Sequence, residues 1–349
     1  MLGVKRALLG ISPSHVSFSR RGFPGGSVVS INHLQSVIRT FVDGYNIALC
    51  EPDMPVLART LDGSFTSEFV GFAYEGAGLY FGMLDMLVPR FDSRLDAFTH
   101  SVAAHHDYIV TVGAGLAIAR APFGPRRLRS YQHRLDPMSA WCLADGYGFH
   151  QGFFEWKRFI QDREHPPARL TLQSRRLFDA GVGRAMWWVF GADPSSIAKS
   201  ISRFDIGRQE EMWTGVGTAL AYAGAGPVNI SSVLLSLAGP YRLALLSGIS
   251  LAAHMREKGG NPADWTKQAC RELLGLTVNE ASELVVTELS QYLARWEGPE
   301  QDKWSNCYVA LQYRLKKRLE NLLSEKPAPA AMAKADCEEK SWQPKQITT

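Results

Sequence analysis

The chain has 349 residues, of which 46% are hydrophobic and 21% are charged. This composition excludes a disordered protein, because the apolar residues suffice for a large buried core. The 38 Lys and Arg residues against 34 Asp and Glu give a formal charge of +4. That charge is too weak and too scattered to indicate binding of nucleic acid, which is therefore not an expected partner.

The five cysteines lie far apart and form no Cys-x-x-Cys pair. They argue against a zinc knuckle, an iron–sulfur cluster or a disulfide framework, and they are typical of a cytoplasmic protein. The apolar stretch near the N-terminus is too short for a signal peptide. Arg242 interrupts the apolar segment 233–253, so we do not expect an integral membrane protein.

From Ser27 onward the apolar residues recur at helical spacing, and the prolines fall mainly between such segments. The pattern predicts one large, mostly α-helical domain over residues 1–323, with a C-terminal helical part at 229–323. Asp193 before Pro194 is a typical helix start, and Lys258 before two glycines is a typical end. Residues 304–323 predict an amphipathic surface helix with one basic face. Residues 324–349, rich in Pro, Ala and charge, predict a disordered tail.

Three glycine motifs occur twice in the same order, at spacings of 102, 105 and 102 residues. The pairs are Val42-Asp-Gly-Tyr45 with Ala144-Asp-Gly-Tyr147, Glu75-Gly-Ala-Gly78 with Ala180-Gly-Val-Gly183, and Val112-Gly-Ala-Gly115 with Thr214-Gly-Val-Gly217. We therefore predict two tandem repeats, at about 41–121 and 143–225. The expected arrangement is a pseudo-twofold packing of the two repeats around an apolar ligand cavity.

Glycine in a helix costs about 1 kcal/mol relative to alanine, so repeated glycines need a structural reason. Gly113 with Ala117, and Gly215 with Ala219, place small residues on one helix face. One interpretation is close packing of another helix, and the other is contact with a flat or rod-like ligand. The segment from Tyr108 resembles the start of a dinucleotide-binding fold, but its third glycine and later acidic residue are missing.

Several polar residues lie in apolar, glycine-rich surroundings, where an ionisable group needs a partner or a catalytic role. Glu75 is a candidate general acid with a raised pKa, or the ion-pair partner of Arg184. Asp145 is a candidate for orienting His150 in proton transfer, or for capping a helix. His106 completes the candidate catalytic residues.

The expected substrate-binding residues are two arginines and four aromatic residues. The arginines would anchor a polar or anionic end of the ligand, while the aromatic rings would line its long unsaturated part or simply belong to the core. We expect no stoichiometric cofactor, and a metal, if one binds, would be held by His106 and His150. The predicted binding residues are Arg184, Arg208, Trp187, Trp213, Tyr147 and Tyr108.

An ordered set of motifs resembles one protein family. The main ones are Arg20-Arg-Gly-Phe23, Gly71-Phe-Ala-Tyr-Glu-Gly76, His106-Asp-Tyr108, Asp145-Gly-Tyr-Gly-Phe-His150, Gly181-Val-Gly-Arg-Ala-Met-Trp187 and Trp213-Thr-Gly-Val-Gly217. With these motifs the chain resembles the DUF1702 proteins, which include the UnbL proteins of enediyne biosynthetic gene clusters, over about residues 5–320. The resemblance implies an enzyme that acts on a polyene or polyyne polyketide intermediate in enediyne core formation.

The resemblance leaves the reaction open among isomerisation, cyclisation and oxidation with a partner. The expected partners are other enzymes of the cluster and a membrane protein resembling an electron-transport subunit. Docking to this membrane protein is expected at residues 304–323 and at Lys5-Arg6, and the expected location is the cytoplasm, with a peripheral position at the membrane as the alternative. Two alternatives remain: a non-catalytic protein that binds and shields a polyene, and a terpene-type cyclase in which Glu75 is the acid.

Overall fold

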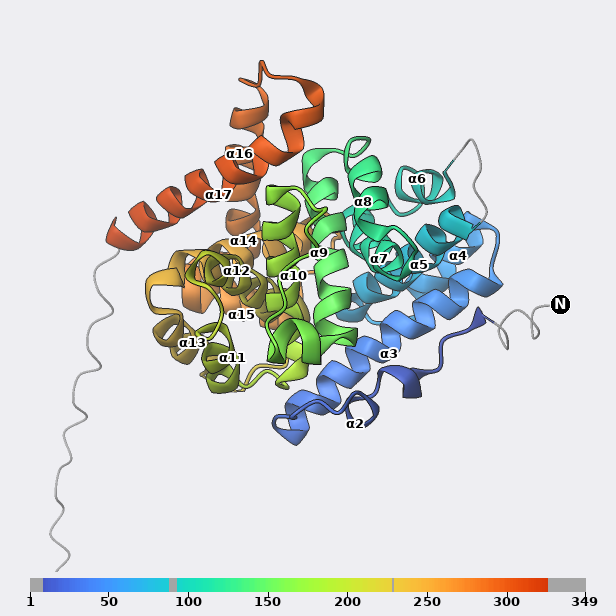
Figure 1. Ribbon diagram of the computed structural model, residues 1–349, viewed down its shortest axis with the longest axis horizontal. Coiled ribbons are helices and arrows are strands. Elements are labelled where there is room, and N and C mark those ends of the chain that lie inside the picture. The colour runs from blue at the N-terminus through green and yellow to red at the C-terminus, as the bar shows by residue number, and fades with distance from the viewer. Residues whose placement is uncertain (1–8, 88–92, 228, 326–349) are drawn as a thin grey trace, which may run out of the picture.

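The computed structural model describes residues 9–87, 93–227 and 229–325, and within these ranges the chain forms helices and no strand (Figure 1). The predicted mostly helical fold is confirmed. The predicted tail, apart from Ser324 and Glu325, and the Lys5-Arg6 pair lie outside the described residues. In chain order the helices are η1 (Pro13–Val16), α2 (Phe18–Arg21), α3 (Val28–Cys50), α4 (Met54–Ser64), α5 (Ser67–Leu87), α6 (Arg94–Thr99), η2 (Ala104–His106), α7 (Asp107–Arg120), α8 (Gly124–Gln132), α9 (Pro137–Phe154), η3 (Lys157–Gln161), α10 (Leu172–Val189), α11 (Pro194–Ile201), α12 (Ile206–Ala223), α13 (Ile230–Ala238), η4 (Gly239–Tyr241), α14 (Arg242–Lys258), α15 (Asp264–Ala269), η5 (Cys270–Leu274), α16 (Val278–Leu293) and α17 (Glu300–Glu325).

The helix boundaries follow local capping chemistry. The Asp193 carboxylate accepts a hydrogen bond from the backbone N–H of Ser196 at 2.7 Å, with Pro194 opening α11 as predicted. Asp136 caps α9 in the same way, by accepting a bond from the Ser139 N–H at 3.2 Å. Helix α14 ends at Lys258, also as predicted. These side chains satisfy N–H groups that have no partner inside the first helical turn.

The long helices α3, α5, α7, α9, α10, α12 and α14 each pack against the next one in the chain. Short helices connect most of them, as the colour gradient of Figure 1 lets the reader follow. The end of α14 then returns to the start of α5 and α7. Lys258 Nζ lies 2.5 Å from Asp107 Oδ2, and Arg256 Nη1 donates to the Glu68 carbonyl at 2.7 Å. The helices from α5 to α14 therefore surround a central space.

The glycine pairs lie where neighbouring long helices cross. A Cβ added at Gly113 would lie 2.0 Å from the carbonyl oxygen of Glu75 in the preceding helix α5. A Cβ added at Gly115 would lie 2.3 Å from the carbonyl oxygen of Leu143 in the following helix α9. Both separations are shorter than any side chain tolerates, so glycine is required for this backbone approach. The close-packing interpretation of these glycines is correct.

The same contact recurs at each successive crossing of the long helices from α3 to α14. In α5, α7, α9, α10 and α12 the first glycine of the pair meets the preceding long helix, and the second meets the next one. The spacing of about 102 residues thus spans three such helices. The pseudo-twofold relation between 41–121 and 143–225 stays a prediction, because these contacts do not single out two larger copies.

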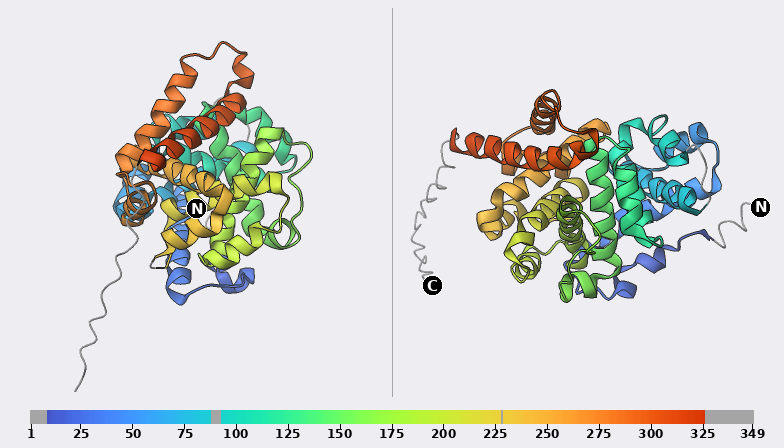
Figure 2. Two further views of the ribbon diagram at one scale, coloured as in Figure 1. Left: turned by 90° about the vertical axis from the view of Figure 1, so that its left-hand side faces the viewer. Right: turned by 45° about the horizontal axis from the view of Figure 1, so that its top comes forward.

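Helices α16 and α17 cover one end of the ring of helices, where α17 packs against α9, α10 and α14 (Figure 2). The indole N–H of Trp141 donates to the Trp304 carbonyl at 2.9 Å, and the Tyr308 hydroxyl donates to the Glu211 carboxylate. Helix α17 contains the predicted amphipathic segment, with Leu315 fully buried and Tyr313 68% exposed.

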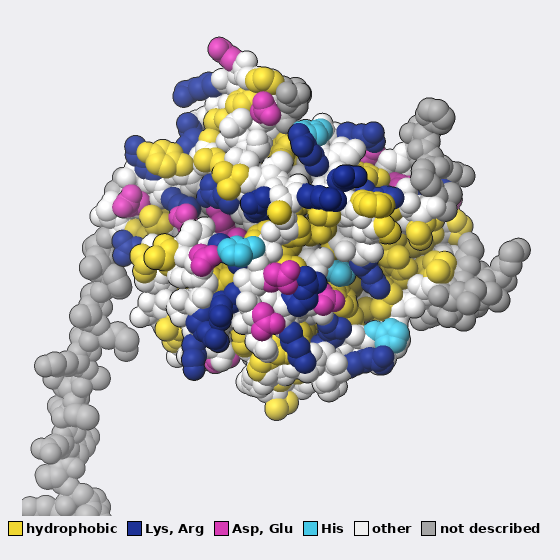
Figure 3. Space-filling view, viewed as in Figure 1, with side chains coloured by type: hydrophobic (Ala, Val, Ile, Leu, Met, Phe, Trp, Pro, Cys, Tyr) yellow, Lys and Arg dark blue, Asp and Glu magenta, His cyan; other side chains and the backbone are white. Residues whose placement is uncertain are grey.

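One stretch among the described residues, Ile230–Lys258, is long and apolar enough to cross a membrane by length and composition. It comprises α13, η4 and α14, and α14 is packed in the ring against α12 and α16. The face of the molecule in Figure 3 carries side chains of both charges intermixed, in keeping with the small net charge.

Candidate functional site

Three cavities follow one another inside the helical ring. Cavity 1, of about 70 Å³, lies among α5, α7, α9, α10, α12, α14 and α17. Cavity 2, of about 40 Å³, shares Phe72, Arg184 and Trp188 with cavity 1. Cavity 3, of about 190 Å³, shares Leu116 and Phe154 with cavity 2. The shared walls place the cavities in a row, a shape that suits a long, narrow and largely apolar ligand.

The long helices run in one direction along this row. In α7, Ile109 lines cavity 1, while Arg120, eleven residues later, lines cavity 3. In α9, Met138 lines cavity 1, while His150 lines cavity 3. A polar residue's position along its helix therefore decides which cavity it faces.

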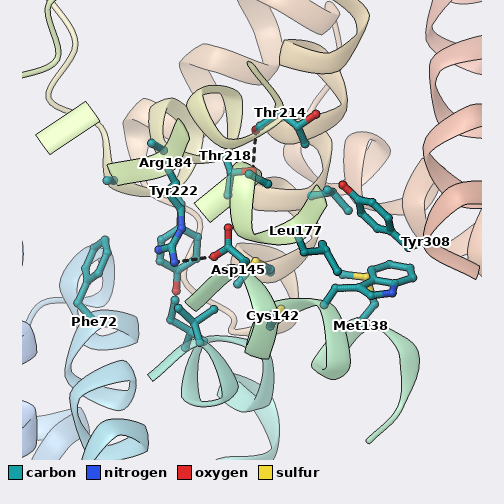
Figure 4. A pocket seen from close by; sticks show the side chains of 18 of the residues that line it. Phe72, Met138, Cys142, Asp145, Leu177, Arg184, Thr214, Thr218, Tyr222 and Tyr308 are labelled. Atoms are coloured by element: carbon teal, nitrogen blue, oxygen red, sulfur yellow. Dashed lines mark hydrogen bonds and ion pairs between the residues drawn. The ribbon is translucent and has the colours of Figure 1, made fainter. Parts of the chain in front are cut away.

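A buried charged cluster lies at the wall between cavities 1 and 2. Arg184 faces both cavities, Asp145 lines cavity 1 and Glu75 lines cavity 2. Nη2 of Arg184 lies 2.6 Å from Oδ2 of Asp145, and its Nη1 lies 4.0 Å from Oε1 of Glu75. Figure 4 shows the guanidinium and the Asp145 carboxylate pointing toward each other. The predicted pairing of Glu75 with Arg184 is confirmed, and Asp145 is a second partner.

The cluster changes the protonation of its carboxyl groups. Burial raises the pKa of Glu75 to about 7, an effect that Arg184 partly opposes and the Asp145 charge reinforces. Burial also raises the pKa of Asp145, against the opposing charge and hydrogen bonding of Arg184. Glu75 therefore exchanges a proton near neutral pH, which is what a general acid or base requires.

Aromatic side chains enclose the charged cluster. The Arg184 guanidinium carbon lies 4.3 Å from the centre of the Phe149 ring, a cation–π contact in surroundings without bulk water. Trp188 lines both cavities, and its buried indole N–H has no hydrogen-bond partner among the described residues. Phe72 and Tyr222, which also line cavity 1, pack edge to face with ring centres 5.2 Å apart.

The remaining polar groups of cavity 1 are few. Thr214 and Thr218 lie one helical turn apart, and the Thr218 hydroxyl donates to the Thr214 carbonyl at 3.0 Å. Burial raises the pKa of the Cys142 thiol well above its usual value, so this cysteine is not activated as a nucleophile. At the far end, Tyr308 and its partner Glu211 close the cavity toward α17.

His150 does not lie next to Asp145, and the predicted pairing of the two is wrong. Both belong to α9, but five residues on a helix separate side chains by about 140°. The Asp145 carboxylate pairs with Arg184, while His150 lines cavity 3. Burial and the charges of Arg120 and Arg21 lower the pKa of His150 to about 3, so its imidazole is neutral.

His106 and His150 are not brought together as metal ligands either. His106 precedes α7 and stacks on Tyr74 with ring centres 4.3 Å apart. His150 lies beside the opposite end of α7, next to Arg120 in cavity 3. Burial lowers the pKa of His106 to about 4. In the described part of the chain no group of three or more His, Cys, Asp or Glu residues could hold a metal ion.

Arg208 serves the packing of α12 on α10. Its Nη2 lies 2.6 Å from Oδ1 of Asp179, and its Nη1 donates to the Arg163 carbonyl at 3.1 Å. Burial raises the pKa of Asp179 to about 6, although Arg208 opposes the shift. Arg208 lines none of the three cavities and is fully engaged by this pair, so its predicted role as a substrate anchor is not supported.

The four predicted aromatic lining residues belong to the core. Trp187 is fully buried and donates to the Gly224 carbonyl at 2.7 Å, and Trp213 is 3% exposed. Tyr147 packs beside Phe178 with ring centres 5.9 Å apart. The Lys258 ammonium nitrogen lies 3.9 Å from the centre of the Tyr108 ring. None of the four lines cavities 1 to 3.

Sequence reasoning missed the aromatic residues that do line the cavities. Phe72, Trp188 and Tyr222 lie beside the charged cluster, and Arg120 lies at cavity 3. Helical spacing from Arg184 does not separate Trp188 from Trp187, because positions four and three residues further on both lie on the same helix face.

No curated protein and no solved structure matches the chain. A protein family matches it over residues 1–310, which include all three cavities and the charged cluster. That family is described as "Protein of unknown function (DUF1702)", and the chain belongs to it.

Proposed function

We propose that this protein is an enzyme that transfers protons within a long, conjugated apolar chain held in cavities 1 to 3. The observation that carries this proposal is the position of Glu75. Its carboxyl group, with a pKa of about 7, lines the apolar cavity 2 and is paired with Arg184, which faces both cavities 1 and 2. Such a group both accepts and returns a proton at neutral pH.

The proposed step balances without an oxidant. The Glu75 carboxylate removes a proton from an allylic carbon, the electron pair shifts along the conjugated chain, and the same carboxyl group returns the proton at another carbon. The product is an isomer of the substrate, and the same shift of electrons can close a ring. Arg184 stabilises the carboxylate form, and Asp145 holds Arg184 in place. The reaction needs no bound cofactor.

We further propose that the chain is a polyene or polyyne polyketide intermediate of enediyne core formation, as the resemblance to the UnbL proteins implies. Formation of an alkyne from an alkene removes electrons, which would then pass to a partner enzyme, such as the proposed membrane protein. The exposed side chains of Val309 and Tyr313 on α17 are the proposed contact with that partner. The proposed location is the cytoplasm, at or near a membrane surface.

The second candidate is a protein that binds and shields a polyene without chemical change. It is favoured by the walls of cavities 1 and 2, which are apolar apart from a few groups. The two functions differ in what is recovered after binding. If the protein only binds, a conjugated polyene extracted into organic solvent regains its original absorbance spectrum. If the protein is the proposed enzyme, the extracted polyene has a permanently altered spectrum, and Glu75→Gln abolishes the change.

A further inference from the structure

Cavity 3 differs from the other two cavities in its charged groups. Arg120, His150 and His15 line it together with apolar residues, and no Asp or Glu is among the described residues of its lining. The charged cluster of cavities 1 and 2, by contrast, contains two carboxylates around one arginine. Cavity 3 is therefore the part of the row with an unbalanced positive charge, which favours an anion.

Arg120 is available to a ligand. It is the last residue of α7, it is exposed, and its guanidinium carbon lies 5.9 Å from the centre of the Phe154 ring. Within the described ranges its side chain makes no hydrogen bond or ion pair. Arg184, Arg208 and Arg176, by contrast, are each paired with a buried or partly buried carboxylate. Arg120 is therefore better placed to anchor an anionic end of the ligand than Arg184 and Arg208, for which this role was predicted.

His150 is the second polar group of this cavity. Its side chain is 9% exposed, it lines the cavity, and its Nδ1 is buried without a hydrogen-bond partner. A buried nitrogen without a hydrogen-bond partner destabilises the fold, so a ligand that hydrogen-bonds to it would recover free energy. Arg21 adds positive charge nearby, because its guanidinium lies 4.9 Å from the same Phe154 ring. Burial, together with the charges of both arginines, lowers the pKa of His150.

We infer that cavity 3 binds the carboxylate end of the substrate, with Arg120 and His150 as hydrogen-bond donors and the apolar chain extending through cavity 2 to Glu75 and cavity 1. This inference rests on the proposed function, because it assigns the orientation of the same ligand. The substrate class is then a long-chain conjugated carboxylate. A planar carboxylate suits the guanidinium group, which offers two parallel N–H donors.

The test uses a fluorescent conjugated tetraene fatty acid and its methyl ester, which share the chain and differ in charge. Binding to the full-length protein is followed by the increase in tetraene fluorescence in an apolar site. We expect the wild type to bind the acid about tenfold more tightly than the ester, the factor for about 1.4 kcal/mol. Arg120→Gln is expected to remove this preference and leave the ester affinity unchanged.

Two further variants keep the test decisive. Arg59→Gln removes an exposed arginine of α4 outside the cavities and is expected to change neither affinity. His150→Leu keeps the volume, removes the imidazole and is expected to weaken binding of the acid only.

If the wild type binds acid and ester equally, the inference is overturned while apolar binding in the cavities stands. If the preference survives in both Arg120→Gln and His150→Leu, the assignment to cavity 3 is wrong. Failure of both probes to bind overturns the proposed function itself and this inference with it.

Discussion

Glu75 and Arg184 face each other at the wall of cavity 2, with 4.0 Å between Oε1 and Nη1. The separation exceeds that of a direct hydrogen bond, whereas Arg184 approaches Asp145 to 2.6 Å. Arg184 thus compensates the negative charge of Asp145 more fully than that of Glu75. For Glu75 the effect of burial therefore exceeds the opposing effect of Arg184, and the pKa rises to about 7. In the proposed reaction, this loosely held carboxyl group is the one that transfers the proton.

The raised pKa of Glu75 predicts a pH dependence of stability. Between pH 4.5 and about 7 only the folded state keeps this proton, so the contribution of Glu75 to the free energy of unfolding falls as pH rises. Relative to wild type, Glu75→Gln should therefore gain about 2 to 3 kcal/mol between pH 5 and pH 8, measured by urea unfolding. The exposed Glu297→Gln is the control and should show no such gain. A pH-independent difference for Glu75→Gln would contradict the raised pKa.

Replacing Arg184 tests the charged cluster as a unit. Arg184→Met leaves two buried carboxylates unpaired, so it should lower the free energy of unfolding at pH 8 by about 3 to 5 kcal/mol. The loss should be smaller at pH 5, where Glu75 is protonated. The double variant Arg184→Met with Asp145→Asn should recover much of the stability. A single-variant loss below about 1 kcal/mol at pH 8 would show that the cluster is not buried as described.

The helix crossings predict opposite effects for two glycine substitutions on one helix. A Cβ at Gly215 would lie 1.9 Å from the Ala180 carbonyl oxygen, so Gly215→Ala forces α10 and α12 apart and should cost about 3 kcal/mol. Gly207 on the same helix has no heavy atom within 4 Å of an added Cβ. Gly207→Ala should therefore be neutral or stabilise by up to about 1 kcal/mol. Thermal and urea unfolding of both variants measure this contrast, which equal effects would contradict.

Filling cavity 1 should block the ligand without touching the charged groups. Ala219 lines this cavity from α12 and is 1% exposed. Ala219→Leu is expected to weaken binding of the conjugated tetraene ester at least tenfold, because the added atoms occupy the space of the chain. Tetraene fluorescence measures the affinity, and the pH dependence of unfolding should stay as in wild type. Unchanged affinity would place the apolar chain outside cavity 1.

The sequence predicted the helical fold and the starts of particular helices, because both depend on local sequence pattern. It also predicted the ion pair of Glu75 with Arg184, because a charged group in apolar surroundings needs a partner of opposite charge. It did not predict the cavities or which aromatic residues face them. Helices α7 and α9 are buried on most sides, so their apolar residues show no periodic face that points to the interior. Trp187 and Trp188 of α10 are likewise both buried, so hydrophobicity could not tell them apart.

The glycine repeats could be recognised in the sequence, but the size of the repeating unit could not. A spacing of 102 residues is also the distance from one long helix to the third one after it. The contacts of the second glycine of each pair with the next helix, such as those of Gly78, Gly148 and Gly183, show that the contact repeats at every helix. The predicted role of Arg208 as a substrate anchor was not supported, for a related reason. Its partner Asp179 lies on another helix, 29 residues earlier, and nothing local in the sequence marks that pairing.

The central claim is that Glu75 transfers a proton within a conjugated chain, and deuterium incorporation measures this most directly. A conjugated polyene carboxylate is incubated with the protein in D₂O, extracted and analysed by mass spectrometry and NMR. The wild type should yield an isomer, with carbon-bound deuterium wherever the Glu75 proton exchanges with solvent before it is returned. Glu75→Gln should yield neither isomer nor deuterium while still binding the tetraene fatty acid. Equal deuterium incorporation by Glu75→Gln, or recovery of the unchanged polyene from the wild type, would contradict the claim.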